Sequence, residues 1–386
     1  MTVAARPTIP AERYADRLRR LADAAGREQL DGLILGVGPD LEYLTGYRAM
    51  PLERLTALAV GAPLPEPILL VPRLERDAAA AGVRPALRIA TWEETEDPYV
   101  ALLSRFGEPA AGDVTIAVSD RLWAIHLLRL QERLPGVRWL SATEVLRELR
   151  MVKDEDEIEL LRLAAQAADR VVAQIAGGTL IGRTEADVAA EVRERLIAEG
   201  HDDAHFAIVA SGPNSASPHH EASNRVIRAG EPIVLDIGGT LGGYGSDITR
   251  TLWVTGGDPG QGPDEEFRHL FGILRTAQEH ATTAVRPGIA CETIDATARE
   301  IISAEGYGEN FFHRTGHGIG LEGHEDPYLV SGNDEPLAAG MAFSVEPGIY
   351  LEGRSGARIE DIVVCGPSGP DVLNQLPRGL RVVAGV

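Results

Sequence analysis

Cysteine and long apolar runs are scarce in this sequence, and each shortage excludes a class of protein. The 386 residues include two cysteines, Cys291 and Cys365, too few for a disulfide framework or a thiolate zinc site. We expect both to be buried thiols. No apolar stretch approaches the ~20 residues that span a bilayer, and the first 20 residues have no apolar core of signal-peptide length. These absences predict a cytoplasmic protein with no membrane partner.

Basic residues are also few relative to acidic ones. The sequence has 37 Lys and Arg against 58 Asp and Glu, which gives a formal net charge of −21. Proteins that bind nucleic acid neutralise phosphates with Lys and Arg, so this balance argues against a nucleic-acid partner. It fits an enzyme in which some of the acidic residues are metal ligands.

Several motifs of common enzyme classes are missing. The sequence has no Walker A run, no H-E-x-x-H and no G-x-S-x-G. The segment 318–323 does fit G-x-G-x-x-G, but that fingerprint needs a strand before it and a helix opening with it. HRTG precedes the segment and HEDP comes after it, so we do not interpret it as a dinucleotide site.

The chain length favours two domains, with a boundary near residue 150. Residues 1–150 are predicted to form an α/β domain, because short apolar runs bounded by turn residues indicate strands at 32–37, 56–61, 67–72 and 115–120. A polar run, KDEDE, then precedes an amphipathic pattern that predicts a long helix from near Asp154. Residues 151–386 form the second predicted domain.

The second domain contains a faint internal duplication. Residues 182–200 match residues 288–306, and the same register aligns the segments after the two predicted helices. Each copy runs into two strand-like segments that carry one acidic residue apiece. We therefore predict an α+β domain made of two repeats related by a pseudo-twofold axis, with a site between them.

Four acidic residues in these segments need a compensating charge. Asp236 and Glu346 lie in apolar runs, where an ionised carboxylate is costly without a partner. A Gly-rich turn before Asp247 predicts a hairpin that brings it close to Asp236. Strand alternation in ARIEDIVV puts Glu360 on the same face as Arg358.

Two divalent cations would supply about that charge. Sites made of carboxylates and one imidazole suit Mn, Fe, Co or Zn, and His317 in HRTGHGIG is the candidate imidazole. A pair of cations can activate a water and polarise a carbonyl, so the pattern predicts a two-metal hydrolase. His219 and His324, in matched loops of the two repeats, are candidates for binding the substrate and the oxyanion. His313 is a weaker candidate for the same pocket.

The segments VLDIGG, SDITRT, HRTGHGIGLEGHE, SVEPGIY and RIEDIVV together resemble the signature segments of the pita-bread metallopeptidases. DLEYLTGY and MVKDEDEIELLRLA extend the resemblance over nearly the whole chain, and within the superfamily it is similar to the Xaa-Pro dipeptidases (prolidases) and aminopeptidase P. The resemblance implies a creatinase/prolidase-like N-terminal domain and a pita-bread catalytic domain.

The same resemblance implies a role for each candidate residue. It assigns two divalent ions per chain, Mn first with Co, Zn or Fe as alternatives, to Asp236, Asp247, His317, Glu346 and Glu360. It makes Glu346 the proton shuttle as well. The remaining pocket residues bind substrate or stabilise the intermediate, and these are His219, His313, His324 and Arg358.

The implied reaction is hydrolysis of the peptide bond before proline in a small peptide, by a homodimer. We expect Xaa-Pro dipeptides as substrates, with Arg358 suited to a proline carboxylate. One alternative is an aminopeptidase P that acts on longer peptides. A more distant one is a non-catalytic binding module on the same fold, which should have lost metal ligands, whereas this sequence keeps all five.

Overall fold

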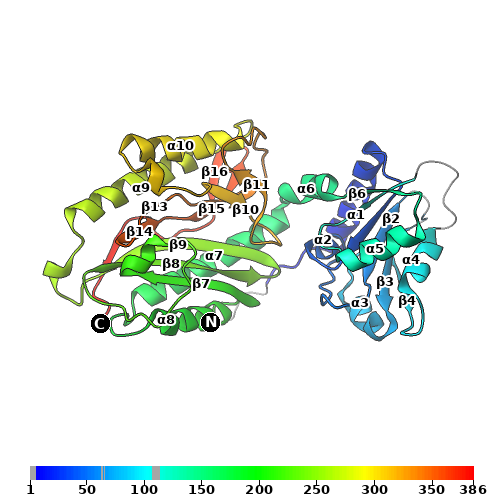
Figure 1. Cartoon of the computed structure of the whole chain (residues 1–386), viewed down its shortest axis with the longest axis horizontal. Coiled ribbons are helices and arrows are strands. Elements are labelled where there is room, and N and C mark those ends of the chain that lie inside the picture. The colour runs from blue at the N-terminus through cyan, green and yellow to red at the C-terminus, as the bar shows by residue number, and fades with distance from the viewer. Residues whose placement is uncertain (1–5, 62–63, 65, 107–113) are drawn as a thin grey trace. The chain divides into compact units, whose positions relative to one another are not determined.

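The chain forms two compact units in the computed structural model, which describes residues 6–61, 64, 66–106 and 114–386 (Figure 1). One unit is Ile9–Arg150, and the other comprises residues 6–8 together with Met151–Val386.

The Ile9–Arg150 unit is built on a six-stranded mixed sheet in the order β4-β3-β2-β1-β5-β6. Its strands are β1 (Gly32–Gly36), β2 (Ala57–Gly61), β3 (Ile68–Pro72), β4 (Arg88–Trp92), β5 (Thr115–Val118) and β6 (Arg138–Ser141). β1 runs parallel to β5 and antiparallel to β2. The helices are α1 (Ala11–Arg27), α2 (Pro39–Thr45), α3 (Arg76–Gly82), α4 (Pro98–Phe106), α5 (Ala124–Arg133) and α6 (Thr143–Met151).

Alternation along the strands gives this sheet two apolar faces. Ile34 and Ile68 pack with Leu102 of α4 and Leu130 of α5 in one core, while Leu33 points to the opposite face and is equally buried. A sheet covered on both faces is the arrangement that nearly continuous apolar strands predict. The predicted strands at 32–37, 56–61, 67–72 and 115–120 are confirmed as β1, β2, β3 and β5, and β4 and β6 are additional.

The first half of the second unit consists of two helices against an antiparallel sheet. α7 (Glu155–Ala176) and α8 (Glu185–Ala198) pack on β7 (Asp203–Ser211), β8 (Glu231–Leu241) and β9 (Tyr244–Val254), and β17 (Arg381–Val383) adds to β9. Asp154 caps α7 in a reciprocal capping box with Glu157, which explains why the helix begins where the sequence predicts. Thr184 caps α8 in the same way, with Asp187.

The second half repeats the plan with a divided sheet. α9 (Glu265–Ala284) and α10 (Cys291–Ala304) pack on β10 (Gly316–Gly318), β11 (Glu325–Leu329), β12 (Ala342–Val345), β15 (Asp361–Gly366) and β16 (Gly369–Val372). A two-stranded sheet of β13 (Gly348–Leu351) and β14 (Ser355–Arg358) lies in the same half. The helices that carry the two matched sequence segments, α8 and α10, occupy corresponding positions in the two halves (Figure 1).

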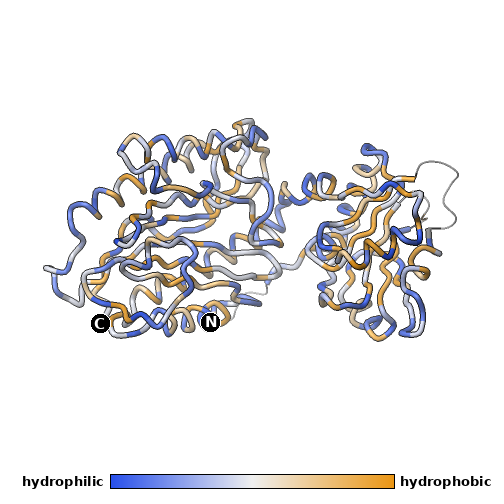
Figure 2. The backbone as a smooth tube through the Cα atoms, in the orientation of Figure 1, coloured by the Kyte–Doolittle hydropathy of each residue, from blue (hydrophilic) through white to orange (hydrophobic). Residues whose placement is uncertain are grey.

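Apolar side chains gather between helices and sheets in both halves, and the tube coloured by hydropathy shows hydrophobic stretches interspersed with hydrophilic ones there (Figure 2). Cys291 and Cys365 are buried free thiols in the core of the second half, as expected. Among the described residues, no helix is long and apolar enough to cross a membrane.

Candidate metal centre

A tight hairpin brings the first two acidic residues together. β8 and β9 pair antiparallel from Glu231–Val254 to Leu241–Tyr244, and Gly242 and Gly243 form the two-residue turn with φ of +63° and +89°. Both turn positions need the left-handed region, which glycine enters without strain. Asp236 lies opposite Thr249, and Asp247 lies opposite Gly238, so both carboxylates project from one face of the hairpin. The predicted hairpin is confirmed.

The other two acidic residues lie where strands break. Glu346 comes directly after the end of β12, and Pro347, which has no N–H for a ladder, separates it from β13. Glu360 lies between β14 and β15, and its backbone N–H donates to the carbonyl of Thr249 in β9. These residues therefore connect strands of different sheets, whereas the sequence pattern predicted continuous strands through both.

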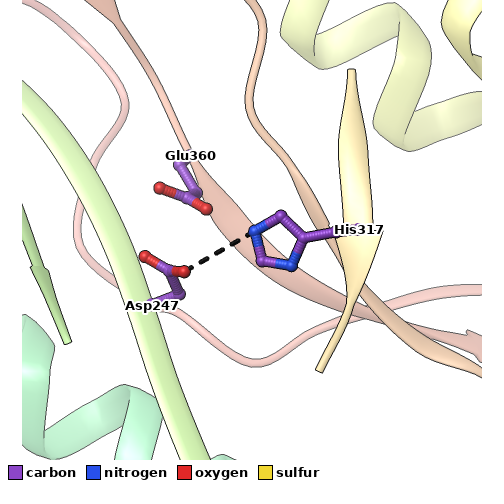
Figure 3. Close-up of side chains that lie close together, drawn as sticks. All are labelled: Asp247, His317 and Glu360. Carbon is purple, nitrogen blue, oxygen red and sulfur yellow. Dashed lines mark ion pairs between the residues drawn. The ribbon is translucent and has the colours of Figure 1, made fainter. Parts of the chain in front are cut away.

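The imidazole joins the acidic residues from β10. Ligand atoms of Asp247, His317 and Glu360 all lie within 4.8 Å of one another (Figure 3). His317 Nε2 is 3.7 Å from Asp247 Oδ2 and 3.2 Å from Glu346 Oε1. Asp236 and Glu346 line the same cavity, which has a volume of about 330 Å³. The structure thus brings all five predicted ligands to one cavity.

Backbone contact fixes how His317 faces this cavity. Its Nδ1–H donates to the carbonyl of Gly318 at 3.1 Å, so Nε2 is the nitrogen that faces the acidic residues. Metal-ligating histidines are held in this manner, with one ring nitrogen donating to a backbone carbonyl and the other free for the metal.

Two of the carboxylates are held by one oxygen each, and their second oxygens have no partner. Arg358 Nη2 donates to Asp236 Oδ2 at 2.5 Å, and Thr249 Oγ1 donates to Glu360 Oε2 at 2.7 Å. Within the described part of the chain, Asp236 Oδ1 and Glu360 Oε1 are buried without a hydrogen-bond partner. A buried carboxylate oxygen without a partner is energetically costly, and a bound cation would provide that partner. These two oxygens are therefore suited to be metal ligands.

The electrostatics of the acidic residues also fit bound cations. Burial, followed by repulsion from Glu360, raises the pKa of Asp247 well above its ordinary value. Burial and repulsion from Glu346 and Asp236 do the same to the pKa of Glu360. Burial would raise the pKa of Glu346 too, but a proton on His317 Nε2, at the position where a cation would bind instead, donates to this carboxylate and together with nearby charges lowers its pKa to about 2. Carboxylates this close together repel one another when they are all ionised. The positive charge of divalent cations between them would offset that repulsion and allow all of them to ionise.

The predicted substrate-handling residues line the same cavity. His219, His313, His324 and Arg358 are all part of its wall. The ring of His324 stacks on that of His317 with centroids 3.7 Å apart. Burial and the proximity of His317 lower the pKa of His324 to about 4, so its imidazole is neutral at neutral pH.

His313 belongs to a hydrogen-bonded chain that the sequence did not reveal. Its Nδ1–H donates to the carbonyl of Arg314, so Nε2 accepts from the hydroxyl of Tyr350 at 2.9 Å. Tyr350 in turn accepts from Arg358 Nη1 at 2.8 Å, and burial raises its pKa to about 12. His313 is thereby connected through Tyr350 and Arg358 to the Asp236 carboxylate.

A fully buried carboxylate outside the cavity holds the loop that carries His219. Glu185, the first residue of α8, accepts hydrogen bonds from the loop at Ser211, Asn214, His220 and Ser223. Burial opposes its ionisation, but these donors lower its pKa to about 2. His220 is one of these partners, with its Nε2 2.8 Å from Glu185 Oε2.

Three apolar residues and a second arginine complete the cavity wall, namely Phe206, Ile208, Pro218 and Arg314. Phe206 and Ile208 share one face of β7, while Ala207 and Val209 point into the core. The alternation of side chains in HFAIVA is the sequence feature from which Phe206 and Ile208 could have been placed on the face opposite the core. Nothing in the sequence singled out Arg314.

Models of two protein families match the chain. Metallopeptidase family M24 matches residues 159–367, and the Creatinase/Prolidase N-terminal domain matches residues 17–152. The two matches fall on the two units in the order that the resemblance implied, and each covers most of its unit.

Similar proteins match over nearly their whole length. The crystal structure of dipeptidase PepE from Mycobacterium ulcerans has 45% sequence identity and a TM-score of 0.88, covering 97% of this chain and 99% of that one. A prolidase structure from Thermococcus sibiricus has 35% identity and a TM-score of 0.88, covering 96% and 99%. An Xaa-Pro dipeptidase of Pyrococcus horikoshii is 30% identical over 366 residues, which is 95% of this chain and 98% of that protein. These matches confirm the predicted two-part fold, an α/β unit and a duplicated pita-bread unit.

Proposed function

The chain belongs to metallopeptidase family M24, and from this premise we propose that it hydrolyses the peptide bond of Xaa-Pro dipeptides. Membership makes it a metal-dependent peptidase that acts on small peptides. Its relatives named dipeptidase, prolidase and Xaa-Pro dipeptidase support the dipeptide and the proline. The observation that carries the proposal is the cavity of about 330 Å³ in which buried carboxylates, two of them with unpaired oxygens, meet imidazoles.

We propose that two divalent ions are held by Asp236, Asp247, His317, Glu346 and Glu360. Oxygen donors with one imidazole fit Mn, Co, Fe or Zn, and Mn is our first choice. Bound cations there lower the pKa of a water and polarise the scissile carbonyl. We further propose a homodimer, with residues 1–150 as the creatinase/prolidase-like domain and 151–386 as the catalytic domain.

Glu346 is the residue suited to moving the proton. Its carboxylate lines the cavity and is 16% exposed, which makes it more accessible than the buried acidic residues around it. It takes a proton from the attacking water. The nitrogen of an Xaa-Pro bond has no hydrogen, so it must gain this proton from Glu346 to leave as a secondary amine.

The histidines and the apolar wall orient the substrate. A neutral imidazole has one N–H, and His324 can donate it to the carbonyl oxygen as negative charge develops there. His219, from the loop held by Glu185, faces the same cavity and can bind the substrate. Phe206, Ile208 and Pro218 provide apolar surface against which a proline ring can pack.

The proposal is tested by a substrate series compared by kcat/KM. Xaa-Pro dipeptides should be cleaved best, with Xaa-Pro-Yaa, longer peptides and Xaa-Ala as comparisons. If longer peptides win by about tenfold, roughly 1.4 kcal/mol of transition-state preference, the enzyme is an aminopeptidase and the dipeptide assignment fails. If Xaa-Ala is cleaved as well as Xaa-Pro, proline specificity fails.

A further inference from the structure

The two arginines in the cavity wall differ in the number of N–H groups left for a ligand. Arg358 is 2% exposed and donates four hydrogen bonds within the protein, to Thr249, Tyr350, Asp236 and the carbonyl of Pro218. A guanidinium has five N–H groups, so most of this one is engaged in holding Asp236 and the loop before His219.

Arg314, which contacts Tyr328, has more N–H groups left to meet a substrate than Arg358 has. Its side chain is exposed, and across the described ranges it makes no ion pair with any carboxylate. Its guanidinium carbon lies 4.5 Å from the centroid of the Tyr328 ring, so the aromatic face supports it. Because this contact already restricts the Arg314 side chain, less conformational entropy is lost when the side chain binds a ligand.

Apart from Arg358, the described lining of the cavity offers no other guanidinium or ammonium group to an anion. Its carboxylates are the proposed metal ligands, and Phe206, Ile208 and Pro218 are apolar. The imidazoles in the lining lack the permanent charge of a guanidinium. A dipeptide whose second residue is proline has its carboxylate on the carbon attached to the scissile nitrogen. An anion is therefore brought into this cavity with every productive dipeptide, and a planar guanidinium matches a carboxylate with two parallel hydrogen bonds.

Resting on the proposed function, we propose that Arg314 binds the free carboxylate of the substrate and thereby selects dipeptides over amides and longer peptides. Substrates that extend beyond proline replace this carboxylate with a neutral amide, which leaves the guanidinium without its ion-pair partner. Arg314 is then the residue that determines substrate length, while Arg358 positions Asp236.

The test compares Leu-Pro with Leu-Pro amide, which differ only in the charge at the carboxyl end. In the wild-type enzyme, kcat/KM for the free acid should exceed that for the amide by about tenfold or more. Arg314→Gln should bring this ratio close to one, mainly by raising KM for the free acid, with metal content unchanged. Arg314→Lys keeps the charge but not the fork and should give an intermediate ratio.

A matched control is Arg354→Gln, which removes a positive charge from an exposed residue paired with Glu266, outside the cavity wall. It should keep the wild-type ratio. The inference fails if the wild-type enzyme cleaves the amide as fast as the acid, or if Arg314→Gln keeps the wild-type ratio. Loss of the ratio in Arg358→Lys alone would assign the carboxylate to Arg358 instead. Cleavage of neither compound would instead overturn the proposed function.

Discussion

At the residue scale, the site residues that could be predicted from the sequence are acidic residues with apolar sequence neighbours. Asp236 and Glu346 stood out because each lies in an apolar run, and the structure brings both to the cavity with Asp247, His317 and Glu360. Tyr350 and Arg314 could not be found in this way. A tyrosine in an apolar strand and an arginine in a polar loop are both ordinary, and only the folded chain brings them beside the acidic residues.

His219 and His324 are predicted to handle substrate without holding metal. Both line the cavity, and among the residues described neither side chain hydrogen-bonds to the acidic residues. His219→Ala and His324→Ala should each lower kcat by about 10²-fold or more, with metal content near that of the wild type. Metal analysis and steady-state kinetics on the same preparations check this.

The control for both variants is His205→Ala, since His205 is an exposed histidine 3.7 Å from Asp203 and outside the cavity wall. His205→Ala should change neither kcat nor metal content. A loss of metal in proportion to activity would mean that the histidine in question is a ligand.

At the element scale, α8 and α10 perform related tasks in the two halves. Glu185 of α8 holds the loop before and after His219. Asp295 of α10 is also buried and accepts from the backbone N–H and the hydroxyl of Thr315, two residues after His313. Each duplicated helix thus supplies an acidic residue that positions a histidine-bearing loop.

Glu185 is predicted to be a positioning residue that acts through His219. Glu185→Gln keeps the side-chain volume but replaces one acceptor oxygen with a donor, so the loop loses hydrogen bonds. We expect kcat/KM to fall by about tenfold through misplacement of His219, with metal content unchanged. A double-mutant cycle is decisive, because Glu185→Gln should cost little further activity once His219 is alanine.

Glu191→Gln on the same helix is the matched control, since Glu191 pairs with Arg183 and Arg195 at the surface. It should leave kcat/KM unchanged. Additive losses in the cycle would mean that Glu185 supports the fold and not the position of His219.

Elements were predictable where a local signal sets their ends. The Gly-Gly turn specified the β8–β9 hairpin, and the Asp154 capping box specified the start of α7. β4 and β6 were missed because their strands, RIATW and RWLS, mix exposed and buried residues over four or five positions. The breaks at Glu346 and Glu360 were missed because the sheet that a strand joins is decided by tertiary packing.

At the scale of the whole molecule, the site exists because two halves meet. Asp236 and Asp247 come from the first half, and His317, Glu346 and Glu360 come from the second. The duplication in the sequence predicted such a meeting. The duplication could not predict that Asp236 Oδ1 and Glu360 Oε1 have no hydrogen-bond partner, because that depends on which carboxylate oxygens accept from Arg358 and Thr249.

The most direct test of this account is the number of divalent ions per chain, measured by elemental analysis on the wild type, Asp247→Asn and Glu360→Gln. Each substitution replaces a buried carboxylate, which neighbouring carboxylates repel, by a neutral amide of similar size. Because this removes electrostatic repulsion, both variants should fold. We predict two ions per wild-type chain, with metal and hydrolysis lost together in both variants. Full hydrolytic activity in protein stripped of divalent ions would contradict the account.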